Sequence, residues 1–223
     1  MDHVALSTQN RLFWLGRYTE RVYTTIQFML EQYDKMLDDE ELNYPSFCSR
    51  IGVPCDYTDS EDFCKRYLFD LASPVSVASN VENMLGNGMV LRETISTPTL
   101  AYLQMAHNAM EMAAQSEGPA IQLQWVLDDI MAFRGSMDDS IENEKTRNVT
   151  KTGGLVERLS LMLRLNWHME NLERELHKLL NRLYKTNLTT DQAALEVITS
   201  KVIDGKNVDN ATLLRSIEGL FLV

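Results

Sequence analysis

The sequence predicts an all-α protein, a single-domain helical bundle of about seven or eight helices, two of them long. Apolar residues recur three and four positions apart over long stretches, which is the spacing of a buried helix face. Strand signals are nearly absent, because no alternating run of β-branched residues exceeds four positions. The chain has 223 residues, 44% of them hydrophobic, so it can bury a sizeable core. We therefore expect one helical domain over residues 1–223.

The first long helix is predicted over residues 8–37, where the apolar stripe continues for about eight turns. Ser7 supplies an N-cap. Residues 38–59 then change character, with two prolines, mixed aromatic residues and no hydrophobic period. We expect this stretch to be an irregular excursion within the domain, with room for a short helical turn.

Four helices are predicted in the middle of the chain, each beginning at a capping or proline signal. Their expected ranges are 60–72, 73–95, 97–115 and 118–141. Proline is favoured in the first helical turn because its missing N–H would have no partner there. Gly86 and Gly88 weaken the second of these helices, since glycine costs about 1 kcal/mol against alanine in a helix.

The last part of the chain is predicted to hold the second long helix, over residues 153–184. A polar connection over residues 142–152 precedes it. Thr190 and Asp191 cap a helix to about residue 203, and Asp209 or Asn210 caps a last helix to about residue 220.

Composition and charge exclude several classes of protein. The chain has 21 Lys and Arg against 32 Asp and Glu, a formal net charge of −11 and a pI near 4.8. Such a balance argues against nucleic-acid binding and against adhesion to an anionic membrane. There is no apolar run long enough for a transmembrane helix, and the N-terminus does not read as a signal peptide. We expect a cytoplasmic protein in which Cys48, Cys55 and Cys64 are free thiols.

Common catalytic and cofactor motifs are missing from the sequence. It contains neither a phosphate-binding glycine loop nor a GxSxG nucleophile elbow, and no Glu-x-x-His pair for a di-iron site. We therefore expect no cofactor and no metal, and the catalytic residues, if any, are unknown. His107 with Glu111, and Glu173 with His177, are spaced as helical surface pairs rather than as ligand sets.

One pattern occurs twice. Gly16 to Arg21 and Gly153 to Arg158 both read G-x-x-x-E-R, 137 positions apart, and Arg92-Glu93 has the same two residues in reverse. A helical glycine permits close approach of another backbone. Adjacent Glu and Arg point about 100° apart, so each is expected to reach another helix rather than its neighbour.

These residues predict an interhelical ion network that gathers arginines into a local positive site. Arginine suits such a network because its planar fork binds carboxylates in bidentate fashion. The simpler alternative is an ordinary surface pair between Arg17 and Glu20. The candidate ligand-binding residues are Arg17, Glu20, Arg21, Arg92, Glu93, Glu157 and Arg158, with Glu20 and Glu157 as candidate general bases.

Four segments carry a resemblance to a known family. RLFWLGRYTERVYTTIQFML (11–30) resembles the opening helix of the bacterial alpha-E proteins, a predicted all-helical family named for its E-R motif. NGMVLRETIST (87–97), IMAFRGSMDDSI (130–141) and GGLVERL (153–159) are similar to later parts of that family, in the same order. The resemblance implies an association with ATP-grasp-type ligases and transglutaminase-like proteins, and so with the making or modification of peptides through amide bonds.

Three functions are compatible with this picture. The first is a non-catalytic subunit that docks an ATP-grasp-type ligase or a transglutaminase-like protein, or holds a peptide substrate. The second is an enzyme of the same pathway whose Glu/Arg cluster binds a carboxylate or phosphate. The third is a homo-oligomeric scaffold that uses the apolar tail at residues 220–223. The sequence leaves the oligomeric state open.

Overall fold

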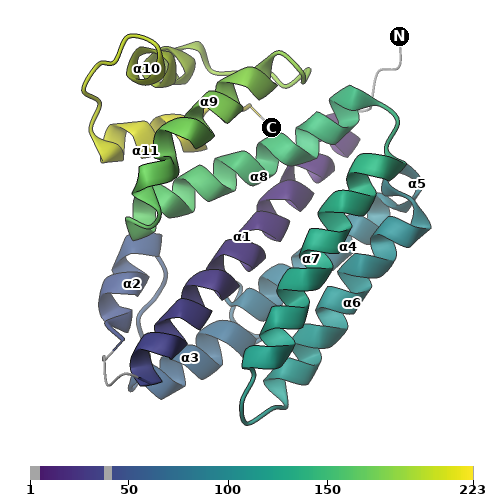
Figure 1. Ribbon diagram of the computed structural model, residues 1–223, viewed down its shortest axis with the longest axis vertical. Coiled ribbons are helices and arrows are strands. Elements are labelled where there is room, and N and C mark those ends of the chain that lie inside the picture. The colour runs from purple at the N-terminus through teal and green to yellow at the C-terminus, as the bar shows by residue number, and fades with distance from the viewer. Residues whose placement is uncertain (1–5, 38–41, 223) are drawn as a thin grey trace. The chain divides into compact units, whose positions relative to one another are not determined.

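The computed structural model of the chain describes residues 6–37 and 42–222, with backbone alone for residues 33–37 (Figure 1). Over these residues it contains eleven α-helices and one short 3₁₀ helix. The described part has no strand, only an isolated bridge between Thr190 and Phe221. The predicted all-α class is confirmed. None of the described helices is both long and apolar enough to cross a bilayer.

The chain divides into two compact units. The first unit consists of residues 1–20 and 142–223, and the second of residues 21–141. Helix α1 (Leu6–Leu37) contributes to both, because the division falls between Glu20 and Arg21. The expectation of one domain over residues 1–223 stays a prediction.

The second unit is built on a hairpin of two antiparallel helices, which Figure 1 shows side by side. These are α6 (Thr97–Ala114) and α7 (Ala120–Ser140), joined by a short turn. Helix α4 (Val77–Val90) packs against α6, and the four-residue α5 (Arg92–Ile95) connects the two. Leu103, Leu123 and Phe133 are fully or almost fully buried in this unit, as the apolar spacing of its helices requires.

The segment predicted as irregular contains a helix of two turns, α2 (Tyr44–Ile51), where a single turn was expected. The Asn43 side chain caps its first turn, and Gly52 ends it in the left-handed region. Aromatic packing explains why this short helix is stable. The Phe47 ring packs against Phe63 and Tyr67 of α3 (Ser60–Phe69), with ring centroids 5.4 and 5.2 Å apart.

The predicted helix 73–95 is wrong at both ends. Residues 73–76 form turns, and Ser76 rather than Ser73 caps α4. The helix then breaks at Leu91, which leaves α5 as a separate element. Ser96, at a φ of 75°, caps α6 through its side-chain oxygen.

The first unit contains the part of α1 up to Glu20, together with the helices that follow residue 141. They are α8 (Glu144–Leu165), the 3₁₀ helix η1 (Met169–Asn171), α9 (Leu172–Leu183), α10 (Gln192–Val202) and α11 (Asn210–Glu218). Figure 1 shows α9 folding back along α8. Asp191 and Asp209 cap α10 and α11, as predicted.

The second long helix was predicted in the wrong place. The segment 142–152, expected to be a polar connection, forms the first turns of α8, capped by Asn143. Its polar residues Thr146, Asn148 and Thr152 are buried on the inner side of the helix. The predicted continuation to residue 184 is interrupted at Asn166 and His168. Both lie in the left-handed region with φ of 52°, which turns the chain back into α9.

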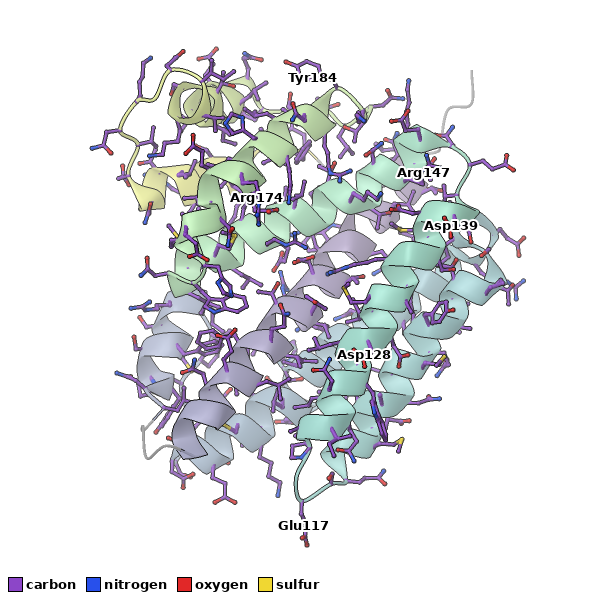
Figure 2. The ribbon with its side chains drawn as sticks, in the orientation of Figure 1. Glu117, Asp128, Asp139, Arg147, Arg174 and Tyr184 are labelled. Carbon is purple, nitrogen blue, oxygen red and sulfur yellow. The ribbon has the colours of Figure 1, made fainter. Side chains whose placement is uncertain are left out.

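The net charge is divided very unequally between the units. Residues 21–141 contain 7 Lys and Arg against 19 Asp and Glu, whereas the first unit contains 14 against 13. Figure 2 shows Asp128 and Asp139 along α7 of the second unit, and Arg147 and Arg174 on α8 and α9 of the first. The acidity of the whole chain is therefore a property of the second unit alone.

Candidate functional site

The first unit brings the two E-R motifs together where the backbones of α1 and α8 touch. A Cβ atom added to Gly16 would overlap the carbonyl oxygen of Thr150, and one added to Gly153 would overlap the carbonyl oxygen of Phe13. Any side chain at either position would force the two backbones apart. The glycines therefore serve close helix packing, as the sequence predicted.

The contact is nearly symmetric. Thr150 precedes Gly153 by three residues, and Phe13 precedes Gly16 by three residues. Each motif thus presents its glycine to the same place on the other helix. The repeat in the sequence corresponds to a local two-fold relation between two helix segments.

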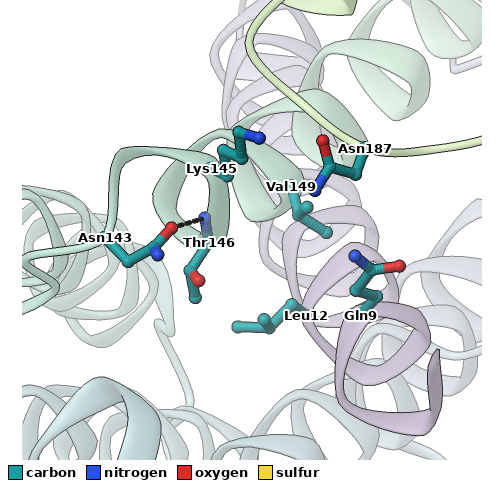
Figure 3. Close-up of a pocket in the computed structure, with 7 residues that line it drawn as sticks. All are labelled: Gln9, Leu12, Asn143, Lys145, Thr146, Val149 and Asn187. Atoms are coloured by element: carbon teal, nitrogen blue, oxygen red, sulfur yellow. Dashed lines mark hydrogen bonds between the residues drawn. The ribbon is translucent and has the colours of Figure 1, made fainter. Parts of the chain in front are cut away.

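A small hollow lies at one end of this helix contact (Figure 3). Leu12 of α1 and Val149 of α8 form its apolar wall, and Asn187 and Lys145 contribute polar groups. Its volume is about 10 Å³, which is room for about one water molecule. The hollow is too small to be a substrate site.

Beyond the glycines, each motif binds the carboxylate of the other. Nε and Nη2 of Arg158 donate to the two oxygens of Glu20, at 2.7 and 3.0 Å. Nε of Arg17 donates to Oε2 of Glu157 at 2.7 Å. The alternative of a local Arg17–Glu20 surface pair is therefore wrong, because Arg17 binds Glu157 and Glu20 is buried against Arg158. The predicted interhelical network exists for these four residues.

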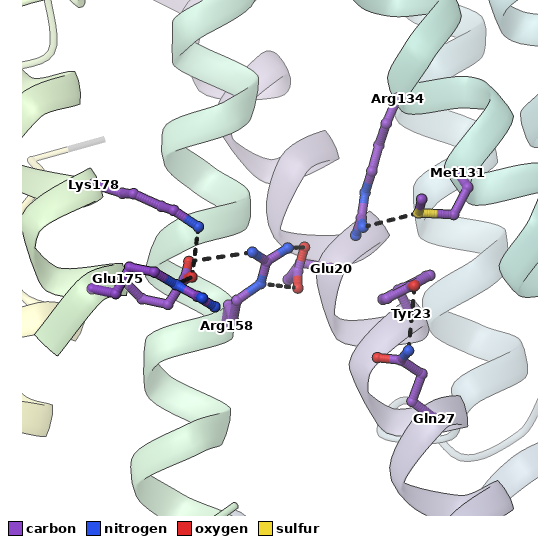
Figure 4. Close-up of polar contacts among 9 residues, drawn as sticks. Glu20, Tyr23, Gln27, Met131, Arg134, Arg158, Glu175 and Lys178 are labelled. Atoms are coloured by element: carbon purple, nitrogen blue, oxygen red, sulfur yellow. Dashed lines mark hydrogen bonds and ion pairs between the residues drawn. The ribbon is translucent and has the colours of Figure 1, made fainter. Parts of the chain in front are cut away.

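Helix α9 extends the network through a carboxylate that the sequence prediction missed (Figure 4). Nη1 of Arg158 donates to Glu175 at 3.3 Å, and Lys178 and Arg174 bind the other oxygen of Glu175 at 2.7 and 3.3 Å. Burial opposes ionisation of Glu175, but Lys178 and Arg158 outweigh it and lower its pKa. Burial likewise opposes the charge of Arg158, while Glu20 and Glu175 raise its pKa.

Burial separates the two signs of charge in this network. The side chains of Glu20, Glu157 and Glu175 are only 3–4% exposed, whereas those of Arg158, Lys178 and Arg174 are 34, 46 and 65% exposed. The network thus has buried carboxylates beneath a cationic outer side. With Arg17 it contains four cations and three carboxylates, which leaves one formal positive charge.

The other three predicted site residues belong to the second unit. Nη1 of Arg21 donates to Oδ1 of the buried Asn80 at 3.4 Å. Arg92 binds its own neighbour Glu93 at 3.0 Å, with both side chains largely exposed. The expectation that an adjacent Arg and Glu do not pair is wrong here. The proposed binding role of Arg21, Arg92 and Glu93 stays a prediction.

The reciprocal Glu–Arg pairs between α1 and α8 agree with a comparison against known protein families. A family model described as a predicted alpha-helical domain with a conserved ER motif, Alpha-E, matches residues 7–220. The chain belongs to the Alpha-E family. Comparison with curated proteins and with solved structures finds no match.

In this Alpha-E chain, one signal could have identified Glu175 from the sequence. Leu172, Leu176 and Leu179 form the apolar face of α9, and Glu175 falls on the same face, where it is 3% exposed. A carboxylate on a buried face requires a cation from a neighbouring element. The amphipathic pattern therefore indicates that Glu175 has a cationic partner, and the structure identifies Arg158, Arg174 and Lys178.

A larger hollow of this Alpha-E chain, of about 240 Å³, lies in the second unit. Asp56, Tyr57 and Arg66 line it, and Arg66 binds Asp56 at 3.1 Å and Asp62 at 3.3 Å. The described residues contain no group of three or more side chains that could hold a metal ion.

Proposed function

We propose that this Alpha-E protein is a non-catalytic accessory subunit that binds an ATP-grasp-type ligase in peptide or amide-bond modification. The observation that carries the proposal is the reciprocal pairing of the two motifs. Glu20 and Glu157 are buried and held by the arginines of the opposite motif, so neither is placed to act as a general base. The ion pairs of the two motifs hold α1 against α8, and in the proposed role the surface of these two helices binds the partner.

The partner class follows from the family resemblance, which associates alpha-E proteins with ATP-grasp-type ligases and transglutaminase-like proteins. A ligase of this kind activates a carboxylate with ATP before an amine attacks it. A helical subunit without a nucleotide loop can contribute by holding the ligase or its peptide substrate in place. In this proposed role the catalytic groups belong to the partner.

The test is affinity purification of the tagged full-length chain from its own cells, followed by mass spectrometry and by a turnover assay. We expect an ATP-grasp-type ligase in the purified complex and a higher rate of ATP-dependent amide formation when the purified chain is added back. Recovery of no ligase, together with an unchanged rate on addition of the chain to the purified enzyme, would overturn the proposal.

The alternative is an enzyme that uses the same cluster, and the exposure of Arg158, Arg174 and Lys178 favours it. These cations could bind a carboxylate- or phosphate-bearing substrate. Glu20→Gln and Glu157→Gln separate the two functions. If Glu20 and Glu157 only hold α1 against α8, the thermal midpoint should fall clearly in both variants. Loss of activity of the isolated chain at an unchanged midpoint would favour the enzyme.

A further inference from the structure

Helices α8 and α9 bring a row of cations together along the line where they pack. Arg158 on α8 lies opposite Glu175, and Arg182 on α9 binds Asn148 at 2.7 Å, so the two helices run antiparallel. Residues four and seven positions apart share a helix face. Lys151 therefore lies on the same face of α8 as Arg158. Arg174 and Lys178 lie on the same face of α9 as Arg182. We define the cationic seam as Lys151, Arg158, Arg174, Lys178 and Arg182.

Three members of the seam retain N–H donors that the buried carboxylates do not use. Arg158 uses three of its five N–H groups on Glu20 and Glu175, and Arg174 and Lys178 each use one donor on Glu175. Their side chains are 34–65% exposed. An incoming carboxylate can therefore bind without breaking the internal pairs.

The size of the seam limits the ligand. The nine residues from Arg174 to Arg182 span about 12 Å, which matches about four residues of an extended peptide. The net charge of −11 disfavours long polyanions such as nucleic acid or an anionic membrane, because the repulsion grows with the number of like charges. A short segment with several carboxylates satisfies both conditions.

We infer that the cationic seam binds an acidic peptide segment, of Glu- or Asp-rich sequence, carried by the protein partner. Side-chain carboxylates of the segment accept hydrogen bonds from Arg158, Arg174 and Lys178, and the neighbouring cations of the seam fix its direction. The inference deepens the proposed accessory role and rests on it. Its binding step can nevertheless be measured without the ligase.

The test is fluorescence anisotropy of labelled hexaglutamate with the purified full-length chain. We expect saturable binding that is lost at about 1 M salt, where the Debye length is only about 3 Å. Arg174→Glu combined with Lys178→Glu should weaken binding roughly tenfold or more. Arg174→Gln combined with Lys178→Gln should also lower the affinity for hexaglutamate. This second variant is needed in case the reversed charges unfold α9.

The matched control is Lys201→Glu combined with Lys206→Glu, which makes the same change of charge in the same unit but away from the seam. This control should bind hexaglutamate with unchanged affinity. The inference is overturned if hexaglutamate does not bind, if hexaglutamine binds equally well, or if the seam and control variants lose the same affinity. Tighter binding of an oligo-dT strand would assign the seam to nucleic acid instead. Failure here with recovery of the ligase would leave the accessory role standing.

Discussion

Arg158 of α8 binds both carboxylate oxygens of Glu20 of α1, although 138 positions separate the two residues in the chain. The pair is half of a reciprocal arrangement, because Arg17 of α1 binds Glu157 of α8. A motif that occurs twice in the sequence thus forms one structural feature. Its two copies cannot be understood separately, since each supplies the counter-ions of the other.

The Arg158–Glu20 pair can be tested with a double-mutant cycle. Arg158→Lys keeps the charge but loses the planar fork, and we expect it to reduce the free energy of unfolding by about 1–3 kcal/mol. Glu20→Gln should cost a similar amount, and the double variant less than the sum of the two. Urea unfolding measures all three, and strict additivity would show that the two residues are not coupled.

The glycine contacts give a prediction that distinguishes adjacent positions. Gly153→Ala should reduce the free energy of unfolding by about 3 kcal/mol or more, because the new Cβ meets backbone atoms that cannot move aside. Gly154→Ala is the control, since the nearest atom to its Cβ lies at an ordinary 3.6 Å. That variant should be neutral or more stable by up to about 1 kcal/mol. Equal losses in both, measured by thermal unfolding, would contradict the packing described here.

Glu175 should contribute to the acid sensitivity of the fold. Its pKa is lower in the folded chain than in the unfolded one, so its stabilisation is present above the unfolded pKa of about 4.3. The stabilisation is lost as the pH falls through the lowered folded pKa. Glu175→Gln should therefore be less stable than the parent at pH 7, with a difference that shrinks below about pH 4.

Glu173→Gln is the matched control for this pH dependence, because Glu173 lies on the same helix with 83% of its side chain exposed. Its unfolding curve should follow that of the parent at every pH. A constant difference between Glu175→Gln and the parent from pH 7 to pH 3 would show that the charge of Glu175 is not what stabilises α9.

The exposed Arg92–Glu93 pair should contribute little to stability. Arg92→Ala and Glu93→Ala are each expected to change the free energy of unfolding by less than about 0.5 kcal/mol, since the two side chains are 59 and 87% exposed. Chemical denaturation checks this directly. A loss of unfolding free energy comparable with that of Arg158→Lys would show that the Arg92–Glu93 pair stabilises the fold.

The thiols should differ sharply in reactivity. Cys55 is exposed, whereas Cys48 and Cys64 are buried, and burial together with the neighbouring Cys55 raises the pKa of Cys48 to about 12. Ellman's reagent should therefore titrate one fast thiol in the native chain and three in denaturant. Cys55→Ser should abolish the fast phase, and a fast phase that survives this change would contradict the burial of Cys48 and Cys64.

The helical class and the pairing of the motifs could be predicted because both depend on local spacing. Apolar periodicity indicates helices, and glycine followed by Glu-Arg indicates close helix packing with charges that face another helix. The ends of the helices were harder to predict. The polar start of α8 is helical because tertiary packing buries Thr146 and Asn148, a contribution that local propensity does not contain.

Partners across the fold were the part that sequence could not provide. Nothing near Glu175 in the sequence indicates that Arg158 binds it, because the turn at Asn166 and His168 creates that proximity. Arg92 shows the opposite case. At the first residue of the short helix α5 its side chain binds Glu93, although ideal helix geometry disfavours pairing of neighbours.

The discontinuity of the first unit has a consequence for biosynthesis. Gly16 and Glu20 are translated before Gly153 and Glu157, which lie 137 positions further along the chain. At ordinary rates of synthesis this delay is on the order of ten seconds. During that time the buried face of α1 has neither its helix partner nor its counter-ions, so the nascent chain exposes an apolar and charged helix that chaperones can recognise.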